Sequence, residues 1–253
     1  MTQGSVGARY AARFSSADTD VAAVQSLRHR MFRPAGVPDG RDIDAADARA
    51  QHLLVERAAD GALVATARLT VIDGAADLAD TYAARHYDLS GFAARAGRMA
   101  ELGRFCIARG APDPDILRLA WGAIARRVLE GGVRTLFGCS SFPGADPARH
   151  RAAFAFLRAR HLGPEAMRPA CLAAGAVPLP ATPPDAVAGR AGLPPLLRSY
   201  LAMGGWVGDH AVPDPDLGTC HVFTALDIRA VPPARRASIL AAAGLQPDGA
   251  RNS

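Results

Sequence analysis

The sequence predicts an α+β domain whose mixed central sheet is flanked by helices. Two strand-like runs, 51–57 and 62–72, are joined by the turn-forming Ala59-Asp60-Gly61, which is typical of an antiparallel hairpin. Further along the chain, a strand, a helix and another strand follow one another between residues 99 and 140. A hairpin followed by this second pattern favours a sheet that contains both antiparallel and parallel pairs.

We expect one domain over residues 1–253, since no shift in composition divides the chain and no internal repeat is visible. Its core should span about 15–162, with a C-terminal extension at 163–253 packed on it. With 49% hydrophobic residues, the chain can bury a sizeable core.

The first half of the chain begins with a helix. Apolar residues at helical spacing predict that it covers 19–32, and Pro34 and Gly36 should end it. A loop rich in Asp and Gly follows over 36–49 and leads into the hairpin. The Ala-rich segment 77–96 is expected to be helical in part and precedes a strand at 99–108.

The second half alternates helices and strands. Pro112 and Pro114 favour the start of a helix that runs to about residue 130, where Gly131-Gly132 should stop it. The remaining elements are expected as a strand at 134–140, a helix at 147–161, a loop or flap at 163–192, a helix at 194–203, an edge strand at 219–228 and a helix at 232–243.

Composition excludes several classes of function. All 29 basic residues are arginine, so neither Schiff-base chemistry nor the lysine of a Walker A loop is available. The net charge of +5 is compatible with an acidic protein partner or an anionic membrane surface. No basic run is interleaved with aromatic residues, so no nucleic-acid partner is expected.

Cysteine spacing and the terminal sequence indicate the compartment. Cys106, Cys139, Cys171 and Cys220 form no CxxC pair, so neither a zinc ribbon nor a disulfide framework is predicted. The N-terminal stretch lacks the apolar core of a signal peptide, and no apolar run approaches the ~18 residues that span a bilayer. We expect a cytoplasmic protein that could contact the inner membrane face peripherally.

The strand expected at 99–108 carries Glu101 and Arg104 among apolar residues. Buried ionised groups cost several kcal/mol unless they are paired or used, so these two side chains form a structural ion pair or belong to a site. Other charged residues have simple structural interpretations. Arg28 could be a solvated helix residue, Asp44 and Asp47 could bond their own loop backbone, and Arg68 could protect an edge strand.

Taken together, these residues have a recognisable spacing. An arginine four residues before Phe32, an Asp-x-x-Asp loop, an Arg-Leu pair and a Glu-x-x-Arg strand resemble the acyl-homoserine-lactone synthases. The chain is more similar still to the ornithine-lipid-forming N-acyltransferases, whose fold is a variant of the Gcn5-related N-acetyltransferase fold. The stretches that carry this closer resemblance are HLLV (52–55), ATARL (65–69), ELGRFCI (101–107), LFGCSSFPGADP (136–147), RHLGPEAMRP (160–169) and LPPLLRSYLAMGGWVGDHAVPDPDLGTCHVF (193–223).

The resemblance implies transfer of a 3-hydroxyacyl chain from acyl carrier protein to the α-amino group of ornithine, which gives lyso-ornithine lipid. Amide formation needs an acceptor for the amine proton, and Glu101 is the first candidate, directly or through a water, with His52 as the alternative. An arginine fork suits the α-carboxylate. The candidates for substrate binding are Arg28, Arg68 and Arg104, with Asp44, Asp47 and Asp209 for the ammonium or for those arginines.

The resemblance also implies an acyl donor on a phosphopantetheine arm, inserted between the parallel strands 99–108 and 134–140. The pyrophosphate loop of the acetyltransferases is missing, since the chain reads Ala108-Arg109-Gly110-Ala111-Pro112 after the first of these strands. This favours acyl carrier protein over free acyl-coenzyme A, with no further cofactor. The carrier is acidic, so the arginine surplus would complement it.

Several alternatives stay open. The same reaction could act on glutamine or lysine, or the chain could be a non-catalytic module that binds the carrier protein or lipid. Lactone synthesis, which would need S-adenosylmethionine, is disfavoured. The acyl-homoserine-lactone synthases carry a tryptophan shortly after the phenylalanine that matches Phe32, whereas here Arg33 and Pro34 follow it directly.

The block GGWVGDHAVPDPDLG (204–218) also has two interpretations. Its Asp209, His210, Asp214 and Asp216 meet no metal-binding spacing, so we expect no metal and favour a structural turn. In the functional alternative, Asp209 or Asp214 would line the amine pocket.

Overall fold

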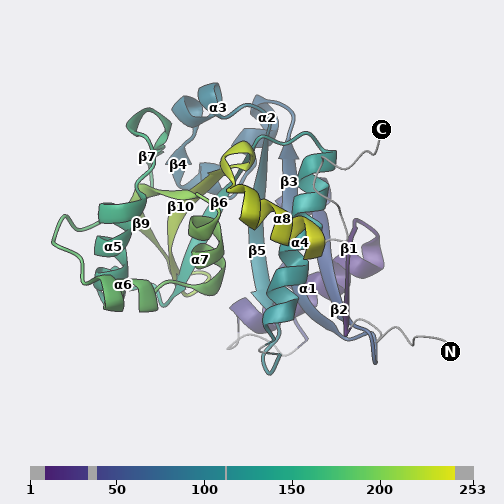
Figure 1. Cartoon of the computed structure of the whole chain (residues 1–253). Coiled ribbons are helices and arrows are strands. Elements are labelled where there is room, and N and C mark those ends of the chain that lie inside the picture. The colour runs from purple at the N-terminus through teal and green to yellow at the C-terminus, as the bar shows by residue number, and fades with distance from the viewer. Residues whose placement is uncertain (1–8, 34–38, 112, 243–253) are drawn as a thin grey trace. The chain divides into compact units, whose positions relative to one another are not determined.

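The computed structural model describes residues 9–33, 39–111 and 113–242 (Figure 1). The helix end expected at Pro34 and Gly36, the helix start at Pro112 and the last residue of the final helix lie outside these ranges. The chain forms two compact units. Of the described residues, unit 1 comprises 9–33, 39–68, 104–111, 113–127 and 238–242, and unit 2 comprises 69–103 and 128–237.

Unit 1 is built around the predicted hairpin, whose strands are β2 (Gln51–Arg57) and β3 (Leu63–Ile72). Gly61 adopts a φ of +69° at the turn, which glycine allows without a steric penalty. A further strand, β1 (Tyr10–Ser15), pairs antiparallel with β2, and helix α1 (Asp18–Phe32) follows it. The sequence analysis missed β1. Its burial alternates only weakly, and Arg13 on it pairs with Asp20 and Glu56 at the surface.

Strand β5 (Met99–Ile107) and helix α4 (Pro114–Glu130) confirm two further predictions. In unit 2, β5 pairs parallel with β6 (Thr135–Pro143), and β6 pairs antiparallel with β10 (Thr219–Asp227). The sheet therefore contains both kinds of pair, and the expected mixed α+β architecture is confirmed.

Two predictions for the C-terminal part are wrong. Strand β10 is not an edge strand, because it pairs with β6 on one side and with β9 (Trp206–Asp214) on the other. Block 204–218 is a strand followed by a turn, rather than a turn alone. The register shift opposite Phe223 and the flanking Gly208 and Pro213 hide the strand alternation of β9.

Helices cover both faces of the unit 2 sheet. Buried residues of α5 (Arg151–His161) and α7 (Pro195–Ala202) pack on one face against Val222 of β10. On the other face, the segment that includes β4 (Tyr87–Asp88) and α3 (Ser90–Ala96) packs against Phe223. The side chains of adjacent β10 residues thus pack into the cores on opposite faces of the sheet.

The remaining elements are short. The loop expected at 163–192 contains β7 (Ala170–Cys171), β8 (Val177–Pro178) and α6 (Ala186–Ala191), so the prediction that it lacks regular structure is wrong in part. In unit 2, α6 packs beside α5 (Figure 1). Helix α2 (Ala75–Ala79) lies within the segment expected to be partly helical, and α8 (Pro233–Ala242) is the final described helix. None of the described helices combines the length and apolar composition that crossing a membrane requires.

The parallel pairing of β5 with β6 is brief. It extends over three rungs, from Met99 opposite Thr135 to Glu101 opposite Phe137. Beyond these rungs, Gly138 approaches the chain of β5 so closely that a Cβ atom there would lie 2.3 Å from the carbonyl oxygen of Leu102. Only glycine fits this contact, which marks the point where the parallel ladder ends.

Candidate functional site

A buried cluster of three arginines and three aspartates lies in unit 1, and we call it the charged cluster. Its side chains come from α1, the loop after it, β3 and β5, and each is at most 9% exposed. Its members are Arg28, Asp42, Asp44, Asp47, Arg68 and Arg104. The equal numbers of opposite charges allow the cluster to be buried, because each ion finds a partner.

Asp47 is the most heavily bonded member of the charged cluster. Its carboxylate accepts hydrogen bonds from Arg28 at 2.8 Å, from Arg68 at 3.1 Å and from Gln25 at 2.9 Å. Burial raises the pKa of Asp47, but the hydrogen bonds and charge of Arg28 outweigh that effect and bring it to about 2. Asp47 is therefore ionised throughout the neutral range.

Asp44 and Asp47 also form a local capping box. The short 3₁₀ helix Ala45–Arg49 begins after Asp44, whose side chain accepts from the amide of Ala46. The carboxylate of Asp47 in turn accepts from the amide of Asp44 at 3.1 Å. Both carboxylates thus bond their own backbone, as one interpretation of the sequence predicted, and they also bind arginines.

Arg104 reaches the charged cluster from a strained position on β5. It is the one non-glycine residue of the described ranges with a positive φ, at +52°. Its guanidinium donates to Asp42 and to Asp44, at 3.1 Å each. Such a backbone conformation costs of order 1–3 kcal/mol and persists only where the surroundings fix it. The ion pairs supply that constraint.

Five of the residues predicted for substrate binding are brought together here, namely Arg28, Asp44, Asp47, Arg68 and Arg104. The sequence analysis gave no role to Asp42, which lies in the expected Asp-rich loop and accepts from both Arg28 and Arg104. Gln25 was also missed. It lies one turn before Arg28 on α1, and this helical spacing was the signal that could have found it.

The three arginines differ in how their donors are used. Arg28 donates through Nε and both terminal nitrogens to Asp42 and Asp47. Arg68 uses Nη1 for Asp44 and Asp47, whereas its buried Nη2 has no hydrogen-bond partner among the described residues. A buried guanidinium donor without a partner is costly, and an anion beside it would remove that cost.

His52 lies beside the charged cluster and is fully buried on β2. Its Nε2 is 3.4 Å from the backbone carbonyl oxygen of Asp47. Burial lowers the pKa of His52, and the positive charges of Arg28 and Arg68 lower it further, against the opposing effect of Asp47. The imidazole is therefore neutral at pH 7.

Glu101 lies in unit 2, where its side chain is buried. Its two carboxylate oxygens accept hydrogen bonds from consecutive backbone amides, those of Tyr82 at 3.1 Å and Ala83 at 2.8 Å. These bonds fix the orientation of the carboxylate, and a carboxylate oxygen can accept more than one hydrogen bond. The sequence analysis did not identify Tyr82, whose hydroxyl donates to Asp214.

Asp209 was the remaining candidate for substrate binding. It lies on β9 in the irregular stretch opposite Phe223, with its side chain one third exposed. Its carboxylate contacts Nδ1 of His210 at 2.7 Å and the guanidinium of Arg168 at 3.5 Å. Asp209 is thus half of a surface ion pair within unit 2.

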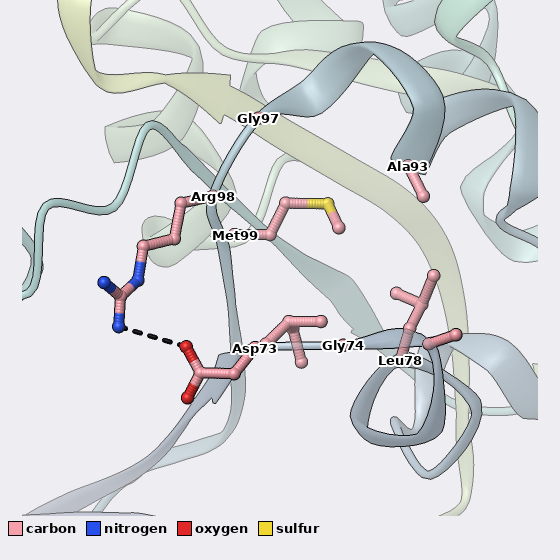
Figure 2. A pocket seen from close by; sticks show the side chains of 9 residues that line it. Asp73, Gly74, Leu78, Ala93, Gly97, Arg98 and Met99 are labelled. Atoms are coloured by element: carbon pink, nitrogen blue, oxygen red, sulfur yellow. Dashed lines mark hydrogen bonds and ion pairs between the residues drawn. The ribbon is translucent and has the colours of Figure 1, made fainter.

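Unit 2 also contains an open pocket of about 470 Å³ (Figure 2). Its wall includes the side chains of Ile72, Leu78 and Met99, and its rim carries Arg98, which donates to Asp73 at 3.0 Å. This volume falls within the range of roughly 300–1,000 Å³ that small-molecule sites occupy.

Comparisons with known proteins agree with this architecture. The family model described as an acetyltransferase (GNAT) domain matches residues 27–122. The chain is 31% identical to an L-ornithine N(alpha)-acyltransferase of Rhizobium meliloti (strain 1021), over 85% of this chain and 79% of that protein. It is 34% identical to an L-ornithine N(alpha)-acyltransferase of Rhodobacter capsulatus, over 67% of this chain and 66% of that protein.

A solved structure supports the fold. FeeM, an N-acyl amino acid synthase from uncultured soil microbes, aligns with a TM-score of 0.51 at 13% identity and covers 87% of this chain and 93% of its own. At that identity the likeness concerns the fold alone. The chain thus resembles an N-acyl amino acid synthase in fold, and it resembles L-ornithine N(alpha)-acyltransferases in sequence.

Proposed function

Because the chain belongs to the L-ornithine N(alpha)-acyltransferase family, we propose that it transfers a 3-hydroxyacyl chain from acyl carrier protein to the α-amino group of ornithine, forming lyso-ornithine lipid. The observation that carries this proposal is the 31% identity over 85% of the chain with a relative of that name. The chain is an acyltransferase with the acetyltransferase (GNAT) domain of such enzymes.

The reaction needs a group that accepts a proton from the amine as the amide forms. We assign this role to Glu101, whose carboxylate is oriented by the amides of Tyr82 and Ala83. A carboxylate oxygen so held can accept from an amine or a water as well. His52 is the weaker candidate, because it is fully buried and its Nε2 lies against the backbone carbonyl oxygen of Asp47.

Binding of ornithine needs a site for its α-carboxylate. We assign this site to Arg68, because its buried Nη2 donor has no partner among the described residues. Arg28 donates through Nε and both terminal nitrogens to two aspartates, so its role is to hold Asp42 and Asp47 in place. Arg104, Asp44 and Asp47 complete the support of Arg68 within the charged cluster.

Replacement of Arg68 tests this assignment. We expect Arg68→Gln to raise KM for ornithine about 10–100-fold, with a smaller change in kcat. This increase corresponds to the loss of one charge-assisted hydrogen bond to the substrate carboxylate. Arg57→Gln is the matched control, since Arg57 is a half-exposed arginine of β2 paired with Asp60. Steady-state kinetics in ornithine at saturating donor measure both constants. An unchanged KM in a folded Arg68→Gln protein would exclude Arg68 as the carboxylate site.

The acyl donor in this proposal is acyl carrier protein, and no further cofactor is needed. Two observations support it: parallel pairing of β5 with β6 stops after three rungs, and the segment after β5 lacks the acetyltransferase pyrophosphate loop. An acidic carrier would also be attracted by the net charge of +5.

A donor and acceptor matrix tests the reaction. The purified protein is incubated with a 3-hydroxyacyl chain on acyl carrier protein or on coenzyme A, with ornithine, glutamine or lysine, and products are identified by mass spectrometry. We expect amide product with the carrier-protein donor and ornithine. Product formed with glutamine or lysine but not with ornithine would contradict ornithine as the substrate. No product from any combination of donor and amino acid would favour a non-catalytic binding module.

We further propose that the protein works in the cytoplasm, in peripheral contact with the inner membrane face, because its product is a lipid. The net charge of +5 supports this, because it would be attracted by an anionic membrane surface. Co-sedimentation with anionic vesicles tests it, and we expect binding to weaken as the salt concentration rises. Absence of vesicle binding by the unaltered protein would contradict it.

A further inference from the structure

Two histidines and an aspartate come together in unit 2, and the proposed acyl transfer gives them no role. His86 precedes β4, Asp214 ends β9 and His221 is the third residue of β10. One ligand atom from each of the three side chains lies within 4.8 Å of the other two. The three residues therefore converge from separate segments of the chain.

His221 is the least satisfied member of this group. It is fully buried, and neither Nδ1 nor Nε2 has a hydrogen-bond partner among the described residues. Buried polar atoms of native proteins are nearly always paired, so an imidazole with two unpaired nitrogens points to a missing partner. Aromatic rings surround the imidazole, with the centroid of His86 at 4.8 Å and that of Tyr82 at 5.5 Å.

We propose that His86, Asp214 and His221 bind a divalent transition-metal ion, with Zn²⁺ as the first candidate. Two imidazoles and one carboxylate form a donor set typical of zinc and of other first-row metals. Tetrahedral zinc with ligand distances of 2.0–2.1 Å places its ligand atoms about 3.3 Å apart. Binding would shorten the separations between ligand atoms from the present 4.8 Å or less to that spacing, and three protein ligands would leave the fourth position for water.

The residues around Asp214 orient its carboxylate. Oδ2 accepts from the hydroxyl of Tyr82, and Oδ1 accepts from the amide of Leu217 at 3.0 Å. Each oxygen keeps a second lone pair for a cation. Hydrogen bonds to a ligating carboxylate are the usual second layer of a protein metal site, because they fix its direction before the ion arrives.

The space between these three side chains suits a metal ion better than an organic ammonium group. An ornithine side chain would need space for its methylene groups as well as its charge. A metal ion needs only the gap between ligand atoms that already lie within 4.8 Å of one another. The packing of His221 against the rings of His86 and Tyr82 therefore favours the ion.

A bound ion would stabilise the position of Glu101. His86 follows Tyr82 and Ala83 in the same short segment, and the amides of those two residues hold the Glu101 carboxylate. Linking His86 to the β9–β10 hairpin would fix that segment. This consequence rests on the proposed function, whereas metal binding itself does not.

The test uses full-length protein without a polyhistidine tag, stripped with a chelator and titrated with Zn²⁺ by calorimetry and with Co²⁺ by absorption spectroscopy. We expect one ion per chain and a visible Co²⁺ spectrum of low-coordinate N/O ligation. His221→Gln and His86→Gln should each weaken Zn²⁺ binding by more than the roughly 10–100-fold that loss of a group supporting a ligand costs. His161→Gln is the matched control, since His161 is a partly buried histidine of α5 in the same unit.

Three outcomes would overturn the proposal. The first is no binding by the unaltered protein, and the second is equal binding by His221→Gln and the control. The third is a sulfur-to-Co²⁺ charge-transfer band, which would place the ion on thiolates such as Cys139 or Cys171. Loss of binding in both His variants, with retained melting temperatures, supports the site even if the acyl-transfer assay fails.

Discussion

Glu101→Gln is expected to lower kcat for acyl transfer by about 10²–10⁴-fold, the range typical of a general base, with little change in KM for ornithine. The physical reason is that an amide cannot accept the proton that the attacking amine releases. The carbonyl oxygen of the introduced glutamine side chain can still accept from the amide of Ala83, so the local fold should persist. Single-turnover rates with saturating donor measure the chemical step.

Two controls make this result interpretable. Glu56→Gln alters a surface glutamate of β2 that pairs with Arg13, and we expect full activity. Circular dichroism melting of Glu101→Gln shows whether the loss of the bond to Tyr82 unfolds the chain at the assay temperature. A folded Glu101→Gln protein with unaltered kcat would exclude Glu101 as the base, and unaltered carrier-protein or lipid binding with no turnover in either protein would favour a binding module.

Asp47→Ala should be the most destabilising single change in unit 1, with a loss of about 3–5 kcal/mol in the free energy of unfolding. Removal of this carboxylate leaves Arg28 and Arg68 with fewer partners in a buried environment and also breaks the capping box with Asp44. Chemical denaturation measures the change. Asp60→Ala, which removes an exposed partner of Arg57, should cost less than about 1 kcal/mol.

Asp47 also makes the free energy of unfolding depend on pH. Its folded pKa of about 2 lies below the ordinary value near 3.9, so its contribution to stability is complete above about pH 4 and is lost as the pH falls from 4 towards 2. The unfolding free energy of Asp47→Asn should therefore fall less over this interval than that of the unaltered protein. Parallel curves for the two proteins would show that Asp47 carries no such coupling.

The sequence predicted those parts of the fold in which local pattern and packing agree. The hairpin, α1, α4 and the two parallel strands have clear apolar periodicity or turn residues. Strand β9 does not, because Gly208, Pro213 and a register shift interrupt its alternation, and missing it made the neighbouring β10 look like an edge. Tertiary pairing, rather than local propensity, determines both strands.

The candidate site could be predicted only where the spacing of its charged residues resembles that of a known acyltransferase family. Arg28, Asp44, Asp47, Arg68 and Arg104 were found in this way, and the structure brings them together. Asp42 was not, because nothing in the sequence distinguishes it from Asp39 in the same loop. The group of His86, Asp214 and His221 has no spacing signal at all, since sheet pairing and the short segment before β4 bring its members together.

Lipid analysis of a bacterial host that lacks ornithine lipid, with and without expression of this chain, tests the central claim most directly. Expression should produce one new lipid class, a 3-hydroxyacyl group in amide linkage to the α-nitrogen of ornithine, identified by tandem mass spectrometry. The Glu101→Gln chain, expressed to the same level, should produce little or none. A new class built on glutamine or lysine, or no new lipid from the unaltered chain, would contradict the account.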